Sequence, residues 1–87
     1  MTGKESEMIL RALQQRFDGE VDVEPVNGDG RYRFAVVSPQ FQAMTQLQRQ
    51  DAIWSLVDQT LSRQATLDIS LILAFAPGEL AEAEGAA

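Results

Sequence analysis

The sequence predicts a small α+β domain in which helices cover one face of a three-stranded mixed sheet. Two segments, near residues 5–17 and 45–61, carry apolar residues at helical spacing, and three other segments show the alternation typical of strands. The chain has 87 residues, of which 45% are hydrophobic, and this size supports one core. We therefore expect a single domain over residues 1–78, followed at 79–87 by an acidic Ala/Glu tail that is disordered.

The first helix is expected over residues 5–17. Its apolar residues recur at four-residue spacing, at Ile9, Leu13 and Phe17. Thr2 and Glu5 have the spacing of a capping box at its start. Gly19 stands where a left-handed residue would end the helix.

The next two segments have the pattern of strands joined as a hairpin. Val21 and Val23 alternate with acidic residues until Pro25, and a second alternating run covers residues 31–37. The turn between them, Asn-Gly-Asp-Gly at 27–30, consists of residues that tolerate positive φ. In the second strand we expect one face to carry Tyr32, Phe34 and Val36 and the other to carry Arg33, Ala35 and Val37. Cross-strand ion pairs then explain Asp22 and Glu24 opposite Arg31 and Arg33 better than a carboxylate site does.

A second helix and a third strand complete the domain. Thr45 and Gln48 have capping-box spacing before the second helix, and Trp54 falls within its apolar stripe, where a core position is expected. In the strand at 67–75, the alternation predicts an inward face of Leu67, Ile69, Leu71, Leu73 and Phe75, and an outward face that includes Asp68, Ser70, Ile72 and Ala74. Because a helix connects the second and third strands, these two strands should be parallel if adjacent.

Composition excludes several kinds of chemistry. The chain has no Cys and no His, so thiol catalysis, disulfides, imidazole bases and soft-metal ligation are not open to it. Seven basic residues stand against thirteen acidic ones, and a net charge of −6 disfavours nucleic-acid binding. The N-terminus is polar and the longest apolar run, Leu71 to Ala76, is too short to span a bilayer, so we expect a cytoplasmic protein without membrane contact.

The stretch from Phe34 to Leu61 resembles the BolA family, and with the flanking elements the resemblance covers about residues 5–80. The residues that carry it are Val36, Val37, Ser38, Phe41, Ala43, Thr45, Leu47 and Arg49, with Pro77 and Glu79 after the last strand. The resemblance implies a KH-like α-β-β-α-β fold. It also points to Arg49 as the family's arginine near the start of the second helix.

The sequence departs from the family at three places. Gln50 stands where members commonly have a His after the arginine, Asp68 where they have a His at the head of the last strand, and the turn at 27–30 where a Cys or His often lies. The family is known for sharing an iron–sulfur cluster with monothiol glutaredoxins through such ligands. The departures therefore imply that this chain holds no cofactor, and we predict no catalytic and no metal-binding residue.

Two functional hypotheses remain. The first is a non-catalytic BolA-like protein-interaction or regulatory domain, a divergent adaptor related to iron–sulfur or stress pathways, with a monothiol glutaredoxin or another protein as its partner. The alternative is a KH-like nucleic-acid-binding domain of a transcription regulator. An enzyme is disfavoured because no nucleophile and base are recognisable. The candidate interaction residues are Arg49, Gln50, Asp68, Arg31 and Arg33, although a structural role explains each of them as well.

Overall fold

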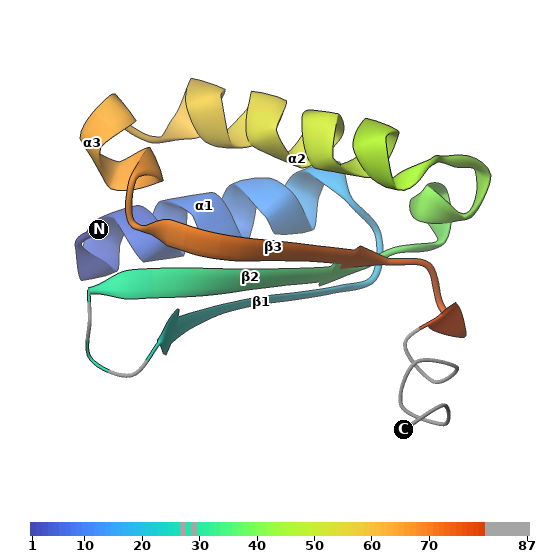
Figure 1. Cartoon of the computed structure of the whole chain (residues 1–87), viewed down its shortest axis with the longest axis horizontal. Coiled ribbons are helices and arrows are strands. Elements are labelled where there is room, and N and C mark those ends of the chain that lie inside the picture. The colour runs from blue at the N-terminus through green and yellow to red at the C-terminus, as the bar shows by residue number, and fades with distance from the viewer. Residues whose placement is uncertain (27, 29, 80–87) are drawn as a thin grey trace.

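The computed structural model describes residues 1–26, 28 and 30–79, and its elements follow the predicted α-β-β-α-β order (Figure 1). The elements are α1 (Gly3–Arg16), β1 (Glu20–Val26), β2 (Arg31–Val37), the 3-10 helix η1 (Pro39–Ala43), α2 (Gln46–Thr60), α3 (Arg63–Thr66) and β3 (Ile69–Phe75). The two short helices η1 and α3 are not predicted from the sequence. Of the turn at 27–30, Gly28 and Gly30 are described, with φ values of 76° and 74°.

The strands form one mixed sheet with the order β1-β2-β3. β1 and β2 are antiparallel, from Glu20 opposite Val37 to Val26 opposite Arg31. β2 and β3 are parallel, as the helical connection between them requires. Helices α1 and α2 both lie on one face of the sheet, which confirms the predicted α+β arrangement (Figure 1). No helix in the described part of the chain combines the length and the apolar composition needed to cross a membrane.

Both predicted capping boxes are present. The Thr2 side chain accepts from the Glu5 N–H while the Glu5 carboxylate accepts from the Thr2 N–H, and Thr45 and Gln48 do the same at α2. The prediction for Gly19 is wrong, because α1 ends with the extended residue Phe17 as its cap. Gly19 has a φ of 116°, and a Cβ there would lie 2.0 Å from the Val37 carbonyl oxygen. Its role is therefore to let the chain pass close to the end of β2.

The core lies between the sheet and the two long helices. Phe34 and Val36 are fully buried and Tyr32 packs against the core, which confirms that these three residues share one face of β2 and shows that this face points inward. Trp54 is partly buried and packs against the core, as expected from its place in the α2 stripe. The fully buried large apolar side chains are Ile9, Leu13, Phe34, Val36, Phe41, Ile53 and Val57.

The predicted inward face of β3 is wrong. Ile72 and Ala74 are buried, with exposures of 6% and 2%, whereas Leu71 is 49% exposed and Leu67, which precedes the strand, is 76% exposed. Ile69 pairs with Tyr32 but Leu71 pairs with Arg33, so Ser70 is an extra residue in the ladder. Such a bulge reverses the alternation, which places Ile69 toward the core and Leu71 on the other face.

Candidate functional site

Side chains of α2 occupy the outer edge of β3. The Gln46 Nε2 donates to the Ala74 carbonyl at 2.9 Å, and the Gln50 Nε2 donates to the Ile72 carbonyl at 3.0 Å. The Phe75 carbonyl accepts from the Ser38 N–H toward β2, so the carbonyls of Ala74 and Ile72 point away from the sheet. Gln50, where the BolA resemblance places a histidine, is thus engaged with the backbone of β3.

Arg49 lies inside the same contact and is only 5% exposed. Its guanidinium donates to the Met44 carbonyl at 3.1 Å and to the Ala74 carbonyl at 3.3 Å. It also binds the Glu79 carboxylate through two hydrogen bonds, of 2.6 Å and 3.0 Å. Through these contacts the guanidinium joins the start of α2 to Ala74 near the end of β3 and to Glu79 after it. This is a structural role.

Glu79 completes this cluster. Its carboxylate also accepts from the Ala76 N–H at 2.9 Å. The hydrogen bonds from Arg49 and then from Ala76 lower the pKa of Glu79 to about 2, and the carboxylate in turn raises the pKa of Arg49. The sequence assigns Glu79 to the tail, yet its side chain contacts the domain one residue beyond the predicted boundary. The rest of the predicted tail, 80–87, lies outside the described residues.

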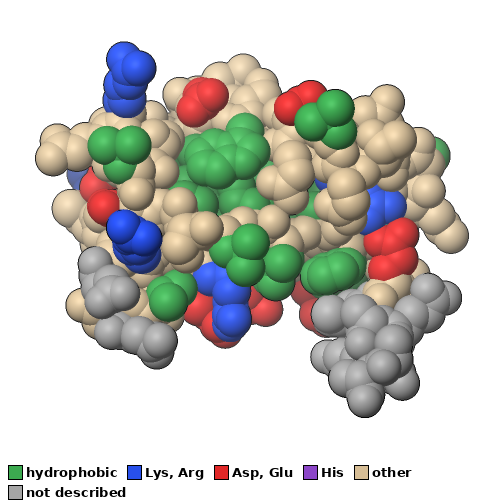
Figure 2. Space-filling model, viewed as in Figure 1, with side chains coloured by type: hydrophobic (Ala, Val, Ile, Leu, Met, Phe, Trp, Pro, Cys, Tyr) green, Lys and Arg blue, Asp and Glu red, His purple; other side chains and the backbone are tan. Residues whose placement is uncertain are grey.

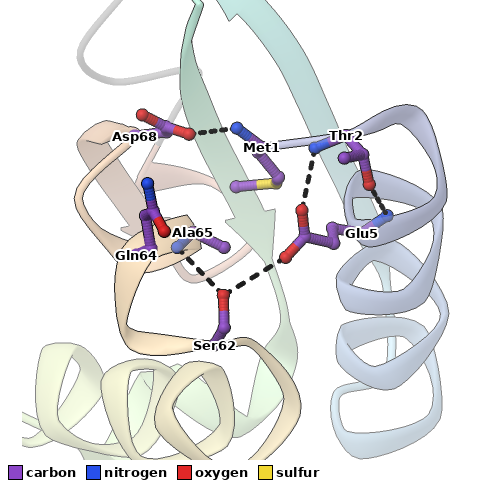
Figure 3. Close-up of a pocket in the computed structure, with 7 residues that line it drawn as sticks. All are labelled: Met1, Thr2, Glu5, Ser62, Gln64, Ala65 and Asp68. Carbon is purple, nitrogen blue, oxygen red and sulfur yellow. Dashed lines mark hydrogen bonds and ion pairs between the residues drawn. The ribbon is translucent and has the colours of Figure 1, made fainter.

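Asp68 lies at the opposite end of β3, beside a shallow pocket of about 290 Å³ (Figure 3). Its carboxylate pairs with the N-terminal ammonium of Met1, and its backbone carbonyl accepts from the Tyr32 N–H at 2.7 Å. The pocket is lined by Met1, Thr2, Glu5, Ser62, Gln64, Ala65 and Asp68.

Three polar side chains of this pocket, those of Thr2, Glu5 and Ser62, serve as helix caps. The Ser62 hydroxyl accepts from the Ala65 N–H at the start of α3 and lies 3.4 Å from the Glu5 carboxylate (Figure 3). The hydrogen bond from the Thr2 N–H lowers the pKa of Glu5, so Glu5 is a weaker base than an ordinary glutamate. Among the described residues, no group of three or more acidic side chains is placed to hold a metal ion.

The five candidate interaction residues do not form one site. Arg49 and Gln50 contact the second half of β3, whereas Asp68 precedes its first residue. Arg33 lies on the face of the sheet away from the helices and pairs with Glu24 at 2.6 Å, which confirms one predicted cross-strand pair. The prediction that Asp22 and Arg31 also face each other is wrong, because Asp22 lies opposite Ala35. Arg31 is exposed at the start of β2 opposite Val26.

The sheet face away from the helices carries a surface that the sequence did not predict correctly. We call it the open face, and its side chains form three rows across the strands, Glu20-Val37-Phe75, Asp22-Ala35-Leu73 and Glu24-Arg33-Leu71. The β1 residues of these rows form an acidic stripe, and Val37, Leu71, Leu73 and Phe75 form an apolar stripe. Figure 2 shows hydrophobic side chains at the surface along the line of β3. The alternation of β3 residues identifies the outward side chains correctly only when the bulge at Ser70 is taken into account.

The residues missed by the sequence interpretation are therefore Glu79, Gln46 and the outward side chains of β3. The Pro77-x-Glu79 ending was the available signal for Glu79. Nothing in the sequence distinguishes Gln46 from the other glutamines of α2, because its role depends on where the β3 carbonyls lie.

Comparison with known proteins gives structural relatives. No protein-family model and no curated protein matches the sequence. The BolA domain of SufE1 from Arabidopsis thaliana is 24% identical, with a TM-score of 0.69 over 91% of this chain and 99% of that chain. BolA1 from Arabidopsis thaliana is 16% identical, with a TM-score of 0.66 over 86% and 94% of the two chains. A bol-like protein from Babesia bovis is 20% identical, with a TM-score of 0.61 over 98% and 94%. The chain therefore has the fold of BolA domains.

Proposed function

We propose that this chain is a non-catalytic protein-interaction domain of BolA type that acts by contact with a partner protein. The observation that carries the proposal is the open face, where apolar side chains of β2 and β3 lie on the side of the sheet opposite to α1 and α2 and no helix of the described residues covers them. Leu71 is 49% exposed there. Exposed apolar side chains gathered on one face are typical of a binding surface.

The positions at which BolA relatives are expected to hold a cluster serve other purposes in this chain. Asp68 faces the N-terminal ammonium and Gln50 donates to the backbone of β3. Carboxylate and amide oxygens are poor ligands for iron–sulfur clusters, and the sequence contains no Cys or His. This supports an adaptor without cluster ligands of its own, related to iron–sulfur or stress pathways.

A monothiol glutaredoxin is the first partner to test. The purified chain is mixed with cluster-loaded monothiol glutaredoxin, and complex formation is followed by calorimetry while the cluster is followed by visible absorption. We expect a complex in which the cluster ligands come from the glutaredoxin side. A dithiol glutaredoxin is the matched control. If neither calorimetry nor co-purification from the native cell finds any protein partner, the proposal is wrong.

The nucleic-acid alternative is not favoured by any contact of the described residues. Arg49 is buried against Glu79, Arg33 pairs with Glu24, and the acidic stripe on the same face repels phosphates. A DNA and RNA titration at low salt tests the alternative: binding that weakens steeply as salt is added would support it, and the absence of binding at low salt would end it.

A further inference from the structure

We propose that the open face binds an amphipathic helix of a partner protein, and that this helix carries basic side chains along one flank of its apolar stripe. The inference rests on the proposed function and deepens it by naming the chemistry of the bound element.

The open face is divided lengthwise into two chemically different halves. In each of its three rows an acidic residue of β1 lies at one end and a large apolar residue of β3 at the other: Glu20 and Phe75, Asp22 and Leu73, Glu24 and Leu71. A ligand that lies along the strands therefore meets apolar surface on one side and carboxylates on the other.

The acidic stripe is only partly neutralised. Glu24 pairs with Arg33, whereas Glu20 and Asp22 are exposed and form no ion pair with any residue in the described ranges. By the same alternation Arg31 lies on this face beside Arg33, so three carboxylates stand against two guanidiniums and the face stays net negative. Charge complementarity then requires a partner with cations beside its apolar surface.

The dimensions of the face suit a helix. Neighbouring strands are about 4.8 Å apart, so the acidic stripe on β1 and the β3 residues of the apolar stripe are separated by about 10 Å, close to the diameter of a helix. Three rows, two residues apart along a strand, extend over about 13 Å, which corresponds to about nine helical residues. A helix with apolar residues at i, i+3, i+4 and i+7 can cover the apolar stripe while Lys or Arg on its flank reaches the carboxylates.

The β3 edge argues against strand addition. A strand added beside β3 would need the carbonyls of Ile72 and Ala74, which already accept hydrogen bonds from Gln50 and Gln46. The available apolar surface is thus the face rather than the edge.

Other occupants fit the charge less well. A second copy of this chain would bring its own acidic stripe to the interface, with only Arg31 and Arg33, at one end of β2, to oppose the three carboxylates among the described residues. The chain segment after Glu79 is Ala- and Glu-rich and would meet the same carboxylates. Both occupants are therefore treated as outcomes of the test.

The test uses two synthetic helical peptides of about 18 residues with identical leucine positions, one with lysine and one with glutamate at the flanking positions. Binding to the full chain is measured by calorimetry and mapped by amide chemical shifts. We expect the lysine peptide to shift β2 and β3 resonances and the glutamate peptide not to bind. Leu71→Ser and Asp22→Lys should each weaken the lysine peptide by roughly fivefold.

Matched controls lie on α1. Met8→Ser removes an apolar side chain of similar exposure, 44%, and Glu7→Lys reverses an exposed charge. Neither should change the affinity by more than about twofold. Equal effects from the two sets of variants, shifts centred on the helices, or no binding of the lysine peptide would each overturn the inference.

The remaining occupants have separate signatures. A concentration-dependent dimer that Leu71→Ser dissociates would show that a second copy of the chain, and not a partner helix, occupies the open face. Shifts of β3 resonances on truncation after Glu79 would show that the segment after Glu79 occupies the open face. Either result overturns the inference. If a protein partner binds and its affinity is unchanged in Leu71→Ser and Asp22→Lys, this inference fails while the proposed function stands; if no protein partner is found, the proposed function itself fails.

Discussion

Arg49 and Glu79, thirty positions apart in the sequence, are joined by two parallel hydrogen bonds of 2.6 Å and 3.0 Å. The arginine is buried and belongs to α2, whereas the glutamate follows β3 and is partly exposed. The pair fastens the end of the sheet to the helix that covers it. The guanidinium also donates to the backbone carbonyls of Met44 and Ala74, so one side chain contacts three separate segments of the chain.

The first prediction concerns the arginine. Arg49→Met should lower the free energy of unfolding by about 2–3 kcal/mol, because the carbonyls of Met44 and Ala74 lose a charged donor. Arg49→Lys should recover part of the loss, since one ammonium cannot replace the planar fork. The measurement is urea unfolding followed by circular dichroism.

Arg11→Met is the control for this substitution. The Arg11 side chain is 71% exposed and pairs with Glu7 within α1, so its loss should change the stability by less than about 0.5 kcal/mol. Equal losses for the two arginines would contradict a specific role of the Arg49 cluster.

The second prediction concerns pH. The pKa of Glu79 is lowered from its ordinary value of 4.5 to about 2, so its contribution to stability is complete above pH 4.5 and is lost as the pH falls toward 2. In Glu79→Gln this part of the pH dependence should disappear. Unfolding midpoints measured between about pH 2 and pH 7 for both proteins test it.

Glu5 titrates in the same direction, because its pKa is also lowered by the capping contact with Thr2. Glu5→Gln is therefore the comparison variant, and it should keep the Glu79 contribution. If Glu79→Gln and the parent chain lose stability in parallel on acidification, the pairing of Glu79 with Arg49 does not persist in solution.

The third prediction concerns Gly19. Gly19→Ala should destabilise the domain by about 2–3 kcal/mol, because the backbone is left-handed there and the new Cβ would meet the Val37 carbonyl. Gly3→Ala, at the start of α1 where the Cβ meets no atom within 4 Å, should leave the stability unchanged or raise it by up to about 1 kcal/mol. Thermal and urea unfolding of the two variants give the comparison. Similar changes in stability would mean that the backbone at Gly19 does not need to pass close to the Val37 carbonyl.

The sequence was informative where local chemistry determines structure. The capping boxes at Thr2 and Thr45 locate both helix starts, and the alternation of β2 identifies Phe34 and Val36 as core, because these signals act within a few residues. The same alternation failed in β3, where the bulge at Ser70 depends on the register with β2 rather than on any residue type. Contacts between distant segments, such as that of Arg49 with Glu79, follow from the packing of α2 on β3 and are not encoded in spacing.

The last prediction tests the corrected face of β3 directly, with two neighbouring residues as mutual controls. Ile72 is 6% exposed and Leu71 is 49% exposed. Ile72→Ala should lower the free energy of unfolding by about 2–4 kcal/mol, because it leaves a cavity between the sheet and the helices. Leu71→Ala should lower it by no more than about 1 kcal/mol, because half of that side chain is already in water.

The two variants are compared by urea unfolding under identical conditions. A uniform alternation through β3 would place Leu71 inside and reverse the order of the two losses. A larger loss of stability for Leu71→Ala would therefore contradict the bulge at Ser70 and the apolar stripe of the open face that depends on it. The expected order would show that folding needs Leu71 much less than Ile72, which leaves the Leu71 side chain available to the proposed binding surface.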